Sequence, residues 1–330
     1  MSHLIDSSNN RDNMAYAGKV PWHGLGQQID ANSTIEEWKT AAGLDWHIQK
    51  RPIFYGIENE NGEKEPMVIP DRFAHVRSDT QAHLGIGSNR FQLMQPGDTL
   101  EFYRDLVAGS RFTIETAGAL NGGAKVWALA RCNLDLKLGN GRDILKPYLL
   151  LATANDGTMA TIADFTTVRV VCNNTLSMAV GHNGGRAAIK VPHSRQFDAD
   201  QVKMELGLID ERLETFAADA DALAAQRVTD EQAINYFVSL YAKTDEQNNV
   251  TNERNLKTVT AKLMNTYRNG PGSELESANG TAWGLMNSIT NFIDFDTVSR
   301  SSENRFSAAQ FGHGAALKAR AFDSALELVA

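Results

Sequence analysis

The sequence of 330 residues is short of features that would assign a function directly. No apolar run approaches the roughly 18 residues that a membrane-spanning helix requires. Residues 1–13 are polar and do not have the charged-then-apolar order of a secretion signal, so we expect a frayed tail and a cytoplasmic protein. Nucleotide-binding loops and glycine-flanked nucleophile motifs are also missing. Because no catalytic set is complete, a non-enzymatic role is favoured while an enzymatic one stays open.

Cysteine is scarce, and the two that are present, Cys132 and Cys172, each lie within an apolar β-like stretch. A structural zinc site usually needs four nitrogen or sulfur ligands, and no histidine stands at finger spacing from either thiol. We therefore expect both cysteines to pack as small hydrophobic side chains, with no disulfide, no metal and no cofactor.

Two histidines, His182 and His193, flank a stretch that contains Gly184 and Gly185. Their spacing fits no metal-ligand pattern, and no carboxylate stands close by in the sequence. Glycine lets backbone N–H groups approach an anion, and Arg186 and Lys190 supply positive charge there. This stretch is therefore compatible with contact to a phosphate backbone, without requiring it.

The formal net charge of −8 is unevenly distributed along the chain. Residues 111–195 carry 10 basic and 5 acidic side chains, a net of +5. Residues 1–110 carry 10 and 15, and residues 196–330 carry 12 and 20, so both flanks are acidic. A basic middle between acidic ends indicates an anion-binding surface, with chance scatter of surface charge as the alternative.

Hydrophobic patterns in the first third predict short elements. Ser33 can cap a helix through Ala42, with Glu36 closing a capping box. Alternation over residues 46–55 and 73–77, with Asn61-Gly62 between them, predicts two strands. Residues 95–106 have the spacing of one helix.

The middle of the chain predicts an antiparallel meander. Residues 112–120 and 125–131 form strands around a glycine-rich turn at 121–123, whose residues tolerate the positive φ angles of a tight hairpin. A second hairpin turns at residues 155–157, with strand patterns at 148–154, 159–162 and 167–171. Asn174 or Thr175 can then cap a short helix through Ala179.

From Phe197 onward the pattern is helical. A heptad stripe predicts a long helix that packs on its own domain, with a self-association seam as the alternative; its members are Val202, Leu206, Ile209, Leu213, Phe216, Ala220 and Leu223. More helices are expected at 230–243, 252–268, 280–293 and 307–328. The sequence thus predicts an α+β fold: a β-rich core over residues 1–195 with a central antiparallel meander and packed helices, then a mainly helical region over 196–330 that can pack on the core as one unit.

The basic residues of the middle third are the candidate nucleic-acid contacts. Cations along a groove neutralise phosphates, and aromatic side chains stack on unpaired bases. Trp127 and Phe165 are the candidate stacking residues, although a buried Trp127 is the favoured reading. The candidate phosphate contacts are Lys125, Arg131, Arg169, Arg186, Lys190 and Arg195.

An enzymatic reading rests on three residues only. Asp156 and Asp164 near the second hairpin could form a carboxylate pair for metal-assisted phosphodiester chemistry, with His193 as a third group. Asn155-Asp156-Gly157 is better explained as a turn, because these residue types favour the turn conformation.

Several motifs resemble a phage- and plasmid-encoded protein family of unknown function that carries the number 932. They are Trp22-His23-Gly24-Leu25-Gly26, Asn155-Asp156-Gly157-Thr158, the stretch from Val168 to Leu176 with Arg169, Cys172, Asn173 and Asn174, Gly280-Thr281-Ala282-Trp283, and Phe311-Gly312-His313-Gly314-Ala315. The resemblance spans nearly the whole chain. It implies a mobile element in a host cytoplasm, where replication, recombination and evasion of host defence are usual tasks, and no established activity.

The order of elements is also similar to that of the Rad52-type single-strand annealing proteins, in which a strand meander feeds a helix. This likeness implies single-stranded DNA as partner, a homo-oligomer, and a role in recombination or replication. The alternative is a non-enzymatic protein-binding module whose acidic helical half inhibits or recruits a host protein.

Overall fold

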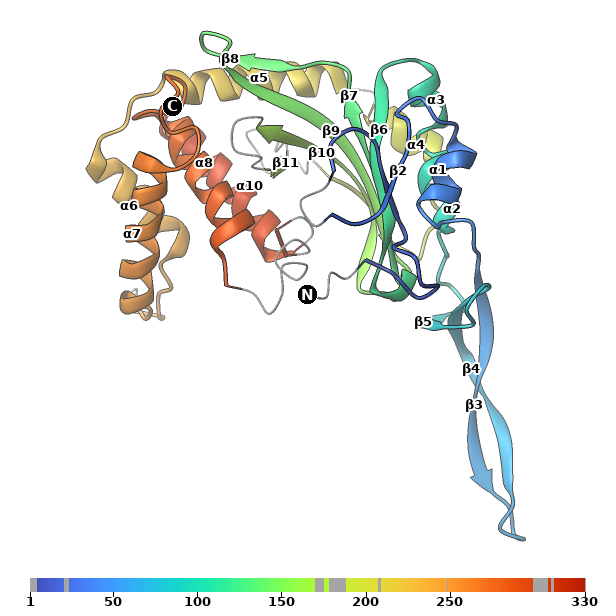
Figure 1. The fold of residues 1–330 in the computed structure, drawn as a ribbon. Helices are drawn as coiled ribbons and strands as arrows, with labels where there is room; N and C mark the ends of the chain where they lie inside the picture. The colour runs from blue at the N-terminus through green and yellow to red at the C-terminus, as the bar shows by residue number, and fades with distance from the viewer. Residues whose placement is uncertain are drawn as a thin grey trace.

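A mostly antiparallel sheet of nine strands forms the centre of the protein, and a thin β-arm projects from one side of it (Figure 1). The computed structural model describes residues 5–20, 24–169, 175–177, 188–206, 209–247, 249–298, 308–309 and 312–329. Helices lie on one side of the sheet and at its far end. The α+β expectation is confirmed.

The path through the large sheet is β11-β10-β9-β7-β6-β1-β2, with β12 beside β10 and β8 beside β9. Asn121, Gly122 and Gly123 adopt positive φ angles in the turn from β6 to β7, as the sequence predicts. The strands are β1 (Met14–Tyr16), β2 (Gln27–Gln28), β6 (Phe112–Leu120), β7 (Lys125–Cys132), β8 (Leu136–Leu138), β9 (Asp143–Ala154), β10 (Met159–Arg169), β11 (Thr175–Ser177) and β12 (Ile189–Val191).

Short helices cover one face of the sheet. They are α1 (Ile35–Ala41), α2 (Pro96–Glu101), α3 (Arg104–Ala108) and α4 (Ala199–Leu206). The hydroxyl of the buried Tyr103 lies 3.0 and 2.9 Å from the carbonyl oxygens of Ala128 and Leu149, which fixes this layer on the strands. Thr34 caps α1 and Glu37 closes the capping box, so the predicted Ser33–Glu36 pair was one residue too early.

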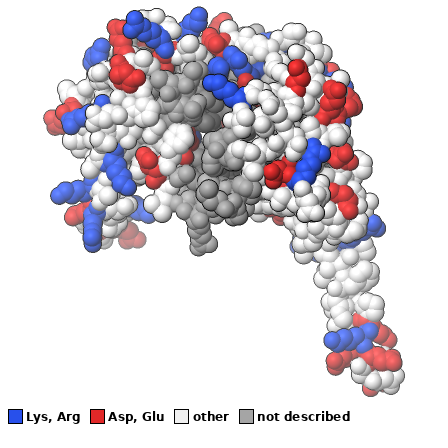
Figure 2. Space-filling model, viewed as in Figure 1, with Lys and Arg blue, Asp and Glu red and all other residues white. Residues whose placement is uncertain are grey.

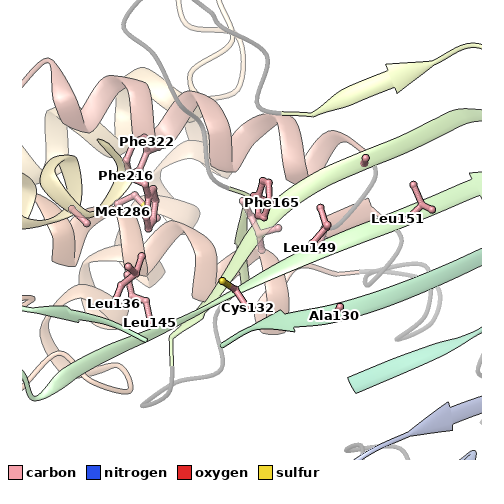
Figure 3. Packing of buried hydrophobic residues seen from close by; sticks show 14 of the residues in the cluster. Ala130, Cys132, Leu136, Leu145, Leu149, Leu151, Phe165, Phe216, Met286 and Phe322 are labelled. Atoms are coloured by element: carbon pink, nitrogen blue, oxygen red, sulfur yellow. The ribbon is translucent and has the colours of Figure 1, made fainter. Parts of the chain in front are cut away.

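The C-terminal helices pack against the sheet at the β8–β9 end. They are α5 (Ile209–Ala225), α6 (Asp230–Tyr241), α7 (Glu253–Asn269), α8 (Ala282–Asn291) and α10 (His313–Leu326). Phe216, Met286 and Phe322 share one hydrophobic cluster with Leu136 and Leu145 of the sheet (Figure 3). Four heptad positions, Val202, Phe216, Ala220 and Leu223, are buried in that cluster, so this part of the stripe packs within the chain. The side chains of Leu206, Ile209 and Leu213 lie outside the description. No helix in the described ranges is long and apolar enough to cross a bilayer.

A buried carboxylate joins the helical part to the sheet. Asp143 at the start of β9 accepts hydrogen bonds from Ser277 Oγ at 2.7 Å and from Trp283 Nε1 at 3.1 Å. Asp143 is buried, so these donors replace the water that a carboxylate would otherwise require.

Three local expectations were wrong. Residues 175–177 form strand β11 instead of a capped helix, because they pair with Thr166, Thr167 and Val168 of β10. The strand patterns at 159–162 and 167–171 belong to one strand as far as Arg169. The helix expected over 95–106 is divided into α2 and α3.

The β-arm is built from β3 (Ile48–Glu58) and β4 (Lys64–Arg77), with β5 (His83–Ser88) beside β4 near its base. Both long strands extend beyond the predicted segments 46–55 and 73–77, and Figure 1 shows their outer parts projecting into solvent.

Arg77 joins the arm to the large sheet. Its guanidinium group lies 4.1 Å from the ring centre of Trp46, pairs with the buried Asp6 of the N-terminal segment, and donates to the carbonyl oxygen of Gly122 at 2.9 Å. Asp79 accepts two further hydrogen bonds, at 2.9 and 2.7 Å. Arg77 is fully buried, and every one of these contacts offsets part of its desolvation.

Replacing Arg77 by Met should lower the free energy of unfolding by about 3 to 5 kcal/mol at pH 7, because Asp6 would stay buried without its cation. Burial raises the pKa of Asp6, but hydrogen bonds from Ser8, Arg77 and Asn13 outweigh it and hold that pKa below its ordinary value. The hydrogen bond from Arg77 likewise lowers the pKa of Asp79. The stability these pairs contribute is present above about pH 4 and is lost as the pH falls further.

The measurement is urea unfolding of both proteins at pH 7 and at steps below pH 4. The difference in the free energy of unfolding between the wild-type protein and the Arg77→Met variant should become smaller below pH 4. Arg72→Met, an exposed neighbour on the same strand, is the control and should change stability by less than about 0.5 kcal/mol. Equal stability of the Arg77 and Arg72 variants would contradict the role assigned to Arg77.

Candidate nucleic-acid interface

Strand β7 separates buried from partly exposed side chains with a strict period of two. Val126, Ala128 and Ala130 are buried under the helices α1–α3, whereas Lys125, Trp127 and Arg131 are partly exposed on the other face. This alternation follows from the pleat, which sends successive side chains to opposite faces of a strand. Two predicted phosphate contacts and one predicted stacking residue therefore share a face.

The strand register adds Lys190 to the same face. Trp127 pairs with Ala152, Ala152 with Ile162, and Ile162 with Lys190, and residues that pair directly point to the same side. Lys190 is exposed. We call the surface formed by Lys125, Trp127, Arg131 and Lys190 the Trp127 face.

Strand geometry gives the size of the Trp127 face. Lys125 and Arg131 are six residues apart on β7, which corresponds to about 20 Å. Three strand steps separate β7 from β12, which corresponds to about 14 Å. The three cations thus mark out an area that several nucleotides of a single strand can cover.

Carboxylates lie on and beside the same face and limit its positive charge. Asp135 forms an ion pair with Arg131 at 2.7 Å. Asp164, 9% exposed, belongs to the same side of β10 as Ile162. Tyr148, which pairs with Arg131, donates a hydrogen bond to Glu115 at 2.9 Å, and burial together with this carboxylate raises the pKa of the Tyr148 hydroxyl. Lys125 is the cation of this face that lies furthest from these carboxylates along the strands, because Lys190 pairs with Ile162, two residues from Asp164 on the same side of β10.

Trp127 lies against the sheet. A Cβ atom on Gly118, its cross-strand partner, would come within 2.6 Å of the indole ring. Ile5, Met14 and Tyr16 pack beside the indole, which keeps part of its surface exposed. The indole is therefore held in place and only partly buried, so the favoured expectation of a buried Trp127 is corrected.

Phe165 cannot stack on a base. Its side chain is 2% exposed and lies in the main core beside Leu149 (Figure 3). The period of two explains the error, because Phe165 follows Asp164 and so points to the opposite face of β10.

Arg195 lies outside the Trp127 face. The chain turns after β12, where the backbone N–H of Arg195 donates to Pro192 at 2.9 Å. Arg195 lines a pocket of about 320 Å³ together with Phe102 and Phe197 of the helix-covered side. His193 is in the same pocket, where it stacks on Phe91 with ring centres 4.2 Å apart. Both residues are thus removed from the proposed surface.

The remaining predicted residues cannot be placed in full. Arg169 ends β10, but its side chain is outside the description, and Arg186, His182 and Cys172 lie outside the described residues altogether. Cys132 is buried in the core, as expected.

Asp156 and Asp164, the carboxylates of the predicted enzymatic site, lie at different places in the second hairpin. Asp156 is in the turn after β9 and accepts from the backbone N–H of Thr158 at 2.9 Å, while Asp164 lies mid-strand in β10. The described part of the chain holds no group of three His, Cys, Asp or Glu side chains placed to bind a metal ion.

Sequence inspection missed Lys146, Tyr148 and Glu115. Lys146 pairs with Val168 and so is on the same side of the sheet as Trp127. The alternation of β9 with β7 could have indicated Lys146 and Tyr148, whereas Glu115 lies at an irregularity in the β6–β7 register that no local pattern reveals.

The comparisons with known proteins give one finding. A family model described as a domain of unknown function, DUF932, matches residues 83–310. No curated protein and no solved structure matches the chain. The similarity to Rad52-type annealing proteins thus stays a hypothesis about element order.

Phe165→Ala should lower the free energy of unfolding by about 3 to 5 kcal/mol, because it leaves a cavity in the core. Trp127→Phe keeps an aromatic ring at the half-buried position and should cost less than half as much. Chemical denaturation of the two variants measures this difference. An equal loss of unfolding free energy in the two variants would contradict the placement of Phe165 in the core and of Trp127 on a partly exposed face.

Proposed function

We propose that this chain, which belongs to the DUF932 family of unknown function, binds single-stranded DNA on its Trp127 face and acts in recombination or replication of a mobile element. The observation that carries the proposal is the register that unites Lys125, Arg131 and Lys190 with a fixed indole. The proposal needs only binding, and no chemical step.

Positive charge supplies the affinity. Each ammonium or guanidinium group that neutralises a phosphate releases condensed counterions, so binding weakens as salt rises. With three cations on a single strand, the logarithm of the binding constant should fall with a slope of about −2 against the logarithm of salt concentration. That slope corresponds to a loss of about 20-fold between 50 and 200 mM salt.

The half-buried indole favours the binding of single-stranded DNA over the binding of a duplex. An aromatic ring stacks on a base only when the base is unpaired or displaced, and each such contact contributes about 1 to 3 kcal/mol. A ring held against Gly118 loses little conformational entropy on binding. Moderate affinity also suits an annealing protein, because the strand must be released once it has paired.

A second candidate function is favoured by a separate feature. The projecting arm carries large apolar side chains in solvent, which is typical of a protein-binding surface. On this alternative the chain recruits or inhibits a host protein and has no affinity for DNA.

Charge reversal of Lys125 and Lys190 to Glu should abolish the binding of a labelled single-stranded oligonucleotide in a gel-shift titration at low salt. Trp127→Ala should weaken binding by about 1 to 3 kcal/mol with little change in the salt slope, because stacking is not a counterion effect. The salt slope of the wild-type protein is measured in the same titrations.

Arg90→Glu with Arg142→Glu is the matched control, since it changes the net charge equally at exposed positions outside the Trp127 face. This control should keep at least most of the wild-type affinity. Absence of binding by the folded wild-type protein at low salt would favour the protein-binding alternative. Cleavage that depends on added divalent metal would favour an enzyme.

A further inference from the structure

The outer half of the arm exposes apolar side chains that no part of its own chain covers among the described residues. Phe54 pairs with Val68 and Tyr55 with Met67, so the two pairs point to opposite faces of a ribbon only two strands wide. Phe54 and Val68 are 55% and 52% exposed, and Tyr55, Met67 and Ile57 are exposed as well. An isolated two-stranded ribbon of this kind gains stability when a partner covers it.

The tip of the arm is acidic. Residues 58–65 hold four carboxylates and one ammonium group, a net of −3 over eight residues. All five of these charged side chains are exposed, and Figure 2 shows acidic groups clustered at the end of the arm. A partner that covers the apolar part of the arm would thus bring positive charge to its tip.

A surface of matching character lies between α6 and α7. It is an open apolar groove of about 470 Å³, lined among others by Ile234, Val238, Leu256 and Met264. Ile234 is 42% exposed although it belongs to the helix face that borders this groove. The groove is open to solvent and is not an enclosed cavity.

Helix α7 gives its side of this groove a surplus of positive charge, although Glu253 also lines the groove and Arg268 forms an ion pair with Asp230 of α6. Residues 253–269 carry four basic side chains and one acidic side chain, a net of +3 within a chain whose total is −8. Arg254, Lys257 and Lys262 are exposed, and Lys257 itself lines the groove. The apolar character and the charge of the groove are therefore both complementary to the arm.

The two surfaces are at opposite ends of the molecule, so one chain cannot join its own (Figure 1). We infer that the arm of one copy docks in the α6–α7 groove of a second copy, with Phe54 and Val68 among the apolar contacts and the acidic tip against Arg254, Lys257 and Lys262. A contact between two different surfaces of the same protein leaves one arm and one groove free after each addition. Such a head-to-tail contact produces a closed ring or an open filament.

The test is sedimentation velocity on the full-length protein over a series of concentrations, without DNA. Wild type should form species larger than a dimer, and these should dissociate as salt rises. Glu58→Lys with Glu63→Lys should raise the dissociation constant for self-association by about tenfold or more. Phe54→Ser with Val68→Ser should have the same effect and leave the fold intact, because both side chains are exposed.

Charge exchange makes the test specific. Arg254→Glu with Lys257→Glu should also disrupt assembly. An equimolar mixture of this groove variant with the Glu58/Glu63 variant should restore species larger than a dimer, because each arm then meets a groove of opposite charge on the other variant. Glu205→Lys with Glu327→Lys changes the charge as much as the arm variant at exposed positions elsewhere and should assemble as wild type does.

A wild-type protein that stays monomeric at every concentration would overturn the inference. So would assembly that the arm variants abolish and the groove variants leave unchanged, because that result indicates pairing of two arms. These outcomes are independent of DNA binding, since the experiment contains no nucleic acid.

Discussion

The buried cation at the base of the arm is the interaction on which the arrangement of the two sheets depends. Arg77 comes from the small sheet, yet its partners are the N-terminal segment at Asp6, the β6–β7 turn at Gly122 and the indole of Trp46. An unpaired buried cation is strongly unfavourable, so these segments can be rearranged only together. Arg77 thus holds the base of the arm on the large sheet together with His75, whose ring nitrogen lies 2.6 Å from the carbonyl oxygen of Asn155.

Much of the fold could be predicted from local patterns. The alternation in β7 and the glycine-rich turn before it identify a half-buried strand and a tight hairpin, because period and turn chemistry are local properties. Pairing is not a local property. Thr175 is a residue type that favours helix caps, yet it pairs with Val168 of β10, because tertiary hydrogen bonds outweigh weak local preferences. The full length of the arm was missed because its outer strands bury nothing and so carry no clear alternation.

In the candidate site, too, features that follow from local sequence could be predicted and features that depend on strand pairing could not. Lys125, Trp127 and Arg131 could be assigned to one face from the sequence, because they stand at even spacing on one strand. Lys190 reaches that face only through three consecutive registers, and Arg195 leaves it at a turn, which charge counting could not reveal. Some basic residues of the middle of the chain therefore share one surface, and others lie elsewhere. Arg131 beside Asp135 shows that the net charge of a segment does not equal the charge that a ligand meets.

The hydrogen bonds of Asp143 also constrain the order in which the chain can fold during its synthesis. Its hydrogen-bond donor Trp283 is 140 residues further along the chain. At a synthesis rate of about 5 to 20 residues per second, a ribosome needs on the order of ten seconds or more to deliver that partner after β9 has emerged. During this interval the carboxylate must remain hydrated and the β8–β9 end of the sheet uncovered. The nascent protein therefore completes this part of its core only after Trp283 has been synthesised.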